Sequence, residues 1–142
     1  MRISSFLLPA LLTATLTACG GGDDESHATM LPGQDCMRAG CHLGQFTVAG
    51  TVFPSPTSPA SAGLANVRVV ITDATRAVTE LTSNAAGNFY TGKAMAWPLQ
   101  VSVVRNGQTT EMSSPLSSAA EGACASSSCH SLGSSLGVVP AY

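Results

Sequence analysis

Hydrophobic and polar residues alternate along the middle of the chain, between Phe46 and Met112. The alternating apolar positions are Phe46, Val48, Val52, Val67, Val69, Ile71, Val101 and Val103. A period of two residues is typical of a strand with one buried face, and no helical period competes with it in this region. The pattern therefore predicts a mainly β fold, a small antiparallel β-sandwich over residues 46–112.

Turn signals separate the predicted strands. The segment "PSPTSPASAG" from Pro54 predicts a loop, because prolines cannot donate to a strand ladder and serines favour turns. "NAAGN" from Asn84 predicts a tight turn, and Asn106-Gly107 is a strong signal for a two-residue hairpin connection. Short connections of this kind favour antiparallel neighbours.

The first eighteen residues are typical of a targeting segment rather than of the fold. Arg2 supplies a positive start, and the apolar run from Phe6 to Leu16 is too short to span a bilayer. The stretch "LTAC" ending at Cys19 resembles the lipobox of bacterial lipoproteins. The resemblance implies a product that begins at a lipidated Cys19, and Gly20 is compatible with sorting to the outer membrane. The alternative is an ordinary secretory signal that leaves Cys19 as a free thiol.

Composition and charge limit the function classes. The chain has 142 residues, 44% hydrophobic and 10% charged, which suffices for one modest domain with a thin core. Removing residues 1–18 takes away one of six basic residues, so five basic and eight acidic residues give the mature chain a net charge of −3. This charge offers no basis for binding nucleic acid. Residues 19–33 are polar and glycine-led and predict a flexible tether.

Near each end of the mature chain stands the same cysteine motif. Each copy has four residues between two cysteines and a histidine directly after the second cysteine. The members are Cys36, Cys41 and His42 in the first copy, and Cys124, Cys129 and His130 in the second. Two of the chain's three histidines occupy this position, so the repetition points to a shared chemistry.

A covalently attached haem accounts for every member of the motif. Two thiols add to the vinyl groups of one porphyrin, and the histidine after the second thiol coordinates the iron. The usual spacing has two residues between the cysteines, and the four found here resemble a minority form of multihaem c-type cytochromes. The sequence thus predicts two haem c groups, held by residues 34–45 and by the segment 113–142, with His42 and His130 as proximal iron ligands.

Two other chemistries could use the same cysteines. An exported protein could close local disulfides, Cys36 with Cys41 and Cys124 with Cys129, although the trailing histidines then have no role. Thiolates and imidazoles could instead hold zinc, but adjacent cysteine and histidine side chains tend to diverge, which suits a tetrahedral site poorly.

The second axial position of each iron needs another donor. Only His27 remains among the histidines, and the methionines of the mature chain are Met30, Met37, Met95 and Met112. Met112, on the segment leading to the second motif, is the first candidate for that haem, with core packing as its alternative. His27 is a candidate distal ligand that could instead be solvated or serve a neighbouring molecule. Met37 lies within its own motif and is poorly placed.

The middle segments are similar to a known domain. The order "VAGTVF", "AGLANVRVVITDA", "LTSNAAGNFYT" and "LQVSVVRNG" resembles the carboxypeptidase regulatory-like domain, a transthyretin-type sandwich, over about half of the mature chain. Its most specific part runs from Thr82 to Tyr90. With a haem motif at each end, the chain resembles small bacterial dihaem c-type cytochrome lipoproteins. The resemblance implies a scaffold without catalytic residues, and we expect Trp97, Phe89 and Tyr90 to pack in the core or against a haem face.

These features predict an electron carrier rather than an enzyme. No nucleophile with a base, paired carboxylates or phosphate loop is visible. We expect a lipid-anchored dihaem cytochrome, at the outer membrane or surface of a Gram-negative bacterium, whose partners are redox proteins, other cytochromes or copies of itself. The sandwich would set the distance between two exposed haems. One alternative is a haem enzyme with an open iron position that acts on peroxide or a nitrogen oxide, although no acid-base residue near either motif supports it. The other is a structural or adhesive lipoprotein stapled by disulfides.

Overall fold

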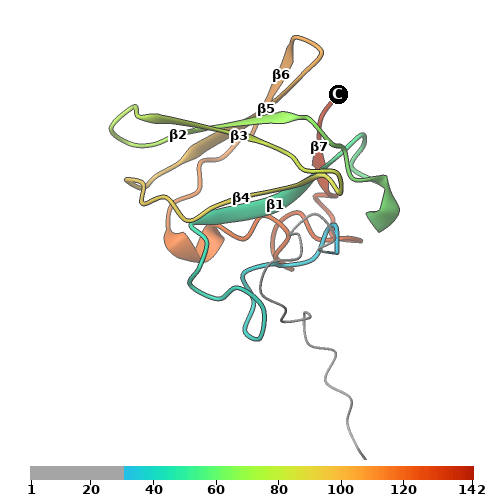
Figure 1. Ribbon diagram of the computed structural model, residues 1–142, viewed down its shortest axis with the longest axis horizontal. Coiled ribbons are helices and arrows are strands. Elements are labelled where there is room, and N and C mark those ends of the chain that lie inside the picture. Colours follow the sequence, from blue (N-terminus) through green and yellow to red (C-terminus); the bar gives the residue numbers. More distant parts are fainter. Residues whose placement is uncertain (1–30) are drawn as a thin grey trace, which may run out of the picture.

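The computed structural model describes residues 31–142 and contains two β-sheets. The three-stranded sheet has the order β4-β1-β7 and comprises β1 (Val48–Phe53), β4 (Asn88–Thr91) and β7 (Val139–Pro140). The four-stranded sheet has the order β3-β2-β5-β6 and comprises β2 (Arg68–Thr72), β3 (Val78–Thr82), β5 (Gln100–Arg105) and β6 (Gln108–Glu111). Two short 3-10 helices, Ala60–Ala62 and Ala119–Glu121, complete the elements. The prediction of a mainly β, small sandwich is confirmed (Figure 1).

The core lies between the sheets and uses the alternating positions of the sequence. Buried side chains from both sheets form one cluster that includes Val48, Val52, Val67, Val69, Ile71, Phe89, Val101 and Val103. Burying such side chains is the main source of stability in a domain of this size. Phe46 is the exception among the predicted positions, because it precedes β1, is half-buried and packs against Tyr90 instead.

Turn residues connect the strands as the sequence predicted. Asn106 and Gly107 have φ angles of 51° and 79°, the left-handed region that a two-residue hairpin between β5 and β6 needs. In the turn before β4, the Asn84 side-chain oxygen accepts hydrogen bonds from the amides of Ala86 and Asn88, both at 3.0 Å. These local bonds fix the register in which β4 enters the sheet.

The C-terminal tail belongs to the sandwich, which therefore extends past the predicted limit at residue 112. Val139 and Pro140 pair with Val52 and Phe53 in parallel, so this sheet is not purely antiparallel. The tail is also held by the Ala141 amide, which donates to the Phe53 carbonyl at 2.8 Å. β1 thus has a hydrogen-bonded neighbour on each side.

The second motif and the residues just before the first motif contact β1. The Gly33 amide donates to Thr51 Oγ1 at 2.9 Å, and Ala49 exchanges backbone bonds with Gly122 and Cys124 at 3.0 and 2.9 Å. In Figure 1 the first motif, near the blue end of the described chain, and the orange-red segment of the second motif lie together below β1. The two motif segments therefore lie on the same side of the sandwich.

Several predicted features lie outside residues 31–142. These are the signal peptide, the lipidation site Cys19 and nearly all of the tether, including His27 and Met30. Within the described range, no helix has both the length and the apolar composition that a membrane span requires.

Candidate functional site

The two cysteine motifs adopt the same backbone arrangement. The amide of the histidine donates to the carbonyl of the first cysteine in both, from His42 to Cys36 at 3.0 Å and from His130 to Cys124 at 2.9 Å. This bond closes the four-residue spacer into a loop and brings the histidine back to the start of its motif. A repeated sequence therefore produces a repeated structure.

Two further contacts recur at corresponding positions. The amide of the second cysteine donates to the carbonyl two residues after the first, at 3.1 Å from Cys41 and 3.0 Å from Cys129. The thiol of the first cysteine points to the carbonyl two residues before it, at 3.6 Å from Cys36 and 3.9 Å from Cys124. The wide spacing is thus an ordered turn, with the two thiols and the imidazole on one compact loop.

Both histidines are oriented through Nδ1. His130 Nδ1 lies 3.1 Å from the Gly137 carbonyl, which can only accept, so Nδ1 carries the proton and Nε2 is the acceptor nitrogen. His42 Nδ1 lies 2.9 Å from Gln45 Oε1, which favours the same tautomer. In metal-binding histidines, a hydrogen bond at the nitrogen that does not bind the metal fixes the orientation of the ring.

A cavity of about 750 Å³ adjoins the second motif. Cys124, Cys129 and His130 line it together with Met112. Its apolar walls come from both sheets and from the C-terminal segments, and include Phe89, Val101, Val103, Leu116, Leu136 and Val139. The volume lies within the usual range for small-molecule and cofactor pockets, roughly 300–1,000 Å³. Size, wall chemistry and donors all fit a haem here.

Met112 directly follows β6 and lines the cavity. Its amide donates to the Val101 carbonyl at 2.9 Å, and its own carbonyl accepts from Gln100 Nε2 at 2.6 Å. The second motif instead begins where Ala123 bridges to Ala49 of the other sheet. The structure therefore brings Met112 to the same cavity as His130, from a different sheet. Its coordination of iron stays a prediction.

Burial disfavours the ionised form of the first thiol in each motif. Burial raises the pKa of the Cys124 thiol to about 12, with smaller contributions from Cys129 and Cys36. Burial, followed by the charge of Asp35, also raises the pKa of the Cys36 thiol. Zinc binds thiolates, which these environments disfavour. Within residues 31–142, no group of three or more histidine, cysteine or acidic residues is arranged to hold an ion.

The state of the thiols bears on the disulfide alternative. Cys36, Cys124 and Cys129 are free, so neither Cys36 with Cys41 nor Cys124 with Cys129 is closed. Cys41 is itself disulfide-bonded, and Arg38 Nε lies 3.5 Å from its sulfur. One sulfur cannot serve a disulfide and a haem thioether together. Haem attachment at the first motif therefore requires Cys41 as a thiol.

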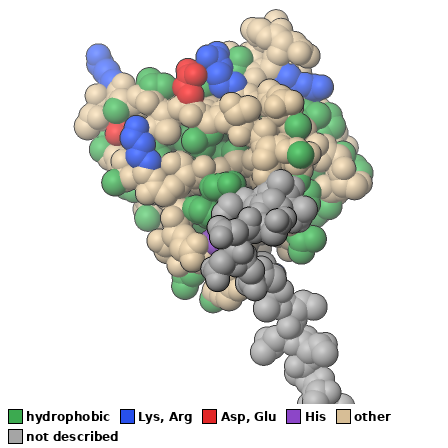
Figure 2. Space-filling model, viewed as in Figure 1, with side chains coloured by type: hydrophobic (Ala, Val, Ile, Leu, Met, Phe, Trp, Pro, Cys, Tyr) green, Lys and Arg blue, Asp and Glu red, His purple; other side chains and the backbone are tan. Residues whose placement is uncertain are grey.

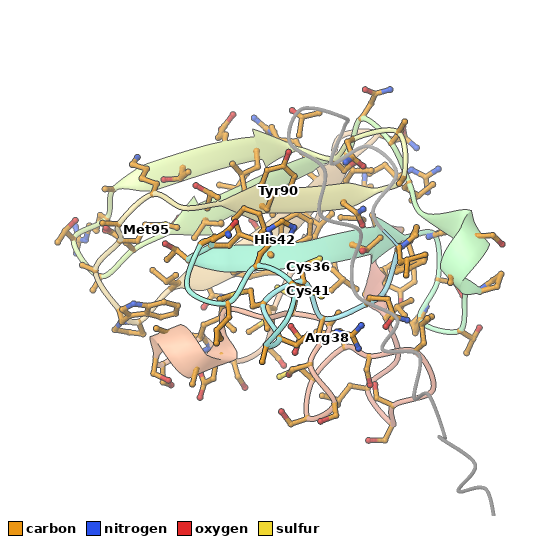
Figure 3. All side chains as sticks on the ribbon, turned by 60° about the horizontal axis from the view of Figure 1, so that its bottom comes forward. Cys36, Arg38, Cys41, His42, Tyr90 and Met95 are labelled. Atoms are coloured by element: carbon orange, nitrogen blue, oxygen red, sulfur yellow. The ribbon has the colours of Figure 1, made fainter. Side chains whose placement is uncertain are left out.

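Figure 3 shows Cys36, Arg38, Cys41 and His42 together on the loop beside β1. The other candidate methionines are less favourably placed than Met112. Met37 lies in the spacer, where its amide donates to Asp35 Oδ1 at 2.9 Å. Met95 and Met112 are both half-buried and pack against the core cluster, but of the two Met112 alone lines the cavity of the second motif.

Sequence reasoning missed two kinds of residue. Phe46 and Tyr90 form a ring stack with His42, with centroids 4.9 Å apart at each step. Glu111 and Glu121 line the cavity of the second motif, so the expectation of no acid-base residue near either motif is wrong there. Glu121, three residues before Cys124, could have been found from its position alone.

Gly50 is a further residue that the sequence pattern did not identify. A Cβ there would lie 2.8 Å from the Cys124 Cβ and 2.9 Å from Phe89 Cζ. The absent side chain lets the second motif and the core ring meet across β1. A lone glycine inside a predicted strand is the signal that could have revealed it.

Comparison with known proteins found no match to a family model, a curated protein or a solved structure. The chemistry must therefore be read from the site itself. Two thiols, an oriented imidazole and a thioether around an apolar cavity suit a covalently held, planar cofactor that binds through its iron.

Proposed function

We propose that this protein is a dihaem c-type cytochrome that transfers electrons. The observation that carries the proposal is the cavity between the sheets, where Cys124, Cys129, His130 and Met112 meet apolar walls. The matching loop at the first motif extends the proposal to a second haem. Within residues 31–142, neither motif closes its own cysteine pair and no group of side chains is arranged to hold an ion, which suits haem better than a local staple or zinc. The disulfide at Cys41 must open before the first motif can hold a haem.

Each protein group has a defined part in this function. Cys36, Cys41, Cys124 and Cys129 would hold the two porphyrins, and His42 and His130 would bind the irons, each of which supplies a one-electron couple. The hydrogen bonds at Nδ1 orient the imidazoles and raise their basicity. Apolar side chains of the second cavity would pack against the porphyrin. Met112, as distal ligand, would raise the potential of that haem.

The fold places the two attachment loops next to each other. Ala49 bonds directly to the second motif, and Thr51, two residues along the same strand, bonds to the segment that leads into the first. The influence of Cys36 on the pKa of Cys124 reflects the same proximity. Electrons would therefore pass between neighbouring sites on one side of the sandwich, rather than across it.

Charged side chains are few. On the face shown in Figure 2 they gather over the four-stranded sheet, where Arg68 and Glu80 form an ion pair at 3.3 Å. Others lie at the motifs, with Asp35 and Arg38 in the first and Glu111 and Glu121 at the cavity of the second. In the proposed setting, a lipid on Cys19 holds the exported protein at the outer membrane, where other cytochromes or copies of itself receive the electrons.

A spectroelectrochemical titration tests electron transfer. The chain is expressed with a c-type maturation system, and the absorbance of the haem is followed as the potential is lowered and raised. We expect two reversible one-electron steps, with one step lost or displaced in His42→Ala and the other in His130→Ala. A protein that binds haem but is not reversibly reduced would contradict the proposal.

One observation favours a second candidate, a haem enzyme. Glu111 and Glu121 line the cavity beside His130 and could move protons there. The Glu121 carboxylate already accepts a hydrogen bond from the Ser117 amide, which is a structural role. Peroxide turnover by the loaded protein that is lost in Glu121→Gln and kept in Glu80→Gln, a distant surface control, would establish the enzyme instead.

A further inference from the structure

An aromatic stack begins at the histidine of the first motif. The ring centroids of His42 and Phe46 are 4.9 Å apart with planes tilted by 41°, and those of Phe46 and Tyr90 are 4.9 Å apart with a tilt of 35°. Such distances are typical of favourable aromatic pairs. Figure 3 shows His42 on its loop and Tyr90 on β4. The stack therefore ties a loop residue to a rigid strand.

The base of the stack is well anchored. Tyr90 pairs with Ala49 of β1 in the sheet register, and the Thr47 amide, next to Phe46, donates to the Thr91 carbonyl at 2.7 Å. Gln45 adds its contact with His42 Nδ1 at 2.9 Å. The imidazole is thus restrained on its face by a ring and at its edge by an amide.

The second motif holds its histidine differently. At the positions corresponding to Gln45 and Phe46 stand Gly133 and Ser134, which offer neither an amide side chain nor a ring. Ser134 Oγ donates to the Cys129 carbonyl at 2.9 Å, and His130 Nδ1 bonds to the backbone at Gly137. Side chains orient the first histidine, whereas backbone orients the second.

We propose that Phe46 and Tyr90 are positioning residues that fix the ring plane of His42 and thereby tune the first haem alone; this rests on the proposed haem-binding function. The plane of an axial imidazole affects the electronic structure of ferric iron, and outer contacts of a ligand tune its metal. Neither residue touches the iron. The role is confined to the first motif, because the second motif has Gly133 and Ser134 where the first has Gln45 and Phe46.

The test compares ring-removing and ring-keeping substitutions in the full haem-loaded chain. Phe46→Leu and Tyr90→Leu remove a ring, whereas Phe46→Tyr and Tyr90→Phe keep it. The readouts are the electron paramagnetic resonance spectrum of the ferric protein and the two midpoint potentials. A chain with Cys124→Ala and Cys129→Ala retains only the first motif and assigns the signals.

We expect the leucine variants to shift and broaden the signal of the first haem and to displace its midpoint, with the second haem unchanged. The ring-keeping variants should restore the original spectrum. Phe46→Met fills the space without a ring and should give the same shift as Phe46→Leu. Agreement between the two variants shows that the shift comes from the lost ring and not from a folding defect of one variant.

Unchanged spectra in the leucine variants, or equal shifts of both haems, would overturn the inference. Intact mass under denaturing conditions separates this failure from that of the proposed function. Two haems with an unresponsive first signal would refute only the role of the stack. A chain without haem on residues 36–42, where Cys41 must first leave its disulfide, would refute both the stack and the dihaem proposal.

Discussion

Replacing Gly50 with alanine tests how closely the second motif packs on β1. The added Cβ would lie 2.8 Å from the Cys124 Cβ and 2.9 Å from Phe89 Cζ, closer than packed carbons approach. Overpacking of this kind costs about 1–3 kcal/mol, whereas the reduced freedom of the unfolded chain returns about 0.4–1 kcal/mol. We expect Gly50→Ala to lower the free energy of unfolding by about 1–2 kcal/mol, because the clash exceeds the entropic gain.

Urea denaturation of wild type and variant, followed by circular dichroism, measures this loss. The matched control is a double-mutant cycle with Phe89→Leu, which shortens one of the two clashing side chains. Since the residues are in contact, the double variant should be more stable than the sum of the single effects predicts, by about 0.5 kcal/mol or more. A Gly50→Ala protein as stable as wild type, or strict additivity, would refute the packing described for Gly50.

Further predictions concern single residues of the core and the site. In haem-free protein at pH 8, Cys124 should be alkylated on the order of a thousandfold more slowly than a thiol of pKa 9.0, because its pKa is raised to about 12. Peptide mass spectrometry measures the rate, and equal rates for Cys124 and urea-unfolded chain would contradict its burial. Thr51→Val should lower the free energy of unfolding by about 1–3 kcal/mol, since the buried Asn88 side chain loses the hydrogen bond that Thr51 Oγ1 donates at 2.6 Å. An unchanged midpoint of urea denaturation would count against this hydrogen bond. Met112→Leu keeps the packing but removes the sulfur, so the oxidised spectrum should lose its weak thioether-to-iron band and the potential of the second haem should fall. An identical spectrum would exclude Met112 as a ligand. The pKa of Asp73 is lowered, chiefly by the Thr75 hydroxyl, so its folded pKa lies below the unfolded value of 3.8. The stability lost in Asp73→Ala should therefore be evident at neutral pH and vanish as the pH falls through the folded pKa, and a difference that persists in stronger acid would contradict this sign.

Periodicity predicted the four-stranded sheet because β2 and β5 each bury one face, whereas all six residues of β1 are buried. Val69 and Ile71 of β2 and Val101 and Val103 of β5 alternate cleanly, and their neighbours face outward. β7 was missed because it has only two residues, one of them a proline, and its pairing depends on the long-range approach of the tail to Phe53. No local pattern carries that information.

The members of the candidate site were visible in the sequence, but their arrangement was not. Spacing identified both motifs, and the place of Met112 on the segment leading to the second motif ranked it first among the methionines. That Met112 reaches the cavity of the second motif depends on how the chain leaves β6 and returns to β1 at Ala123. The stack on Tyr90 likewise depends on the register between β1 and β4, which is a tertiary property.

Mass spectrometry of the protein produced with a c-type maturation system tests the central claim most directly. The account predicts an intact mass, under denaturing conditions, that exceeds the apoprotein by two haems, with one haem on the peptide containing residues 36–42 and one on that containing residues 124–130. A colourless chain without added mass at either motif, whether its cysteines are free or paired, would contradict it.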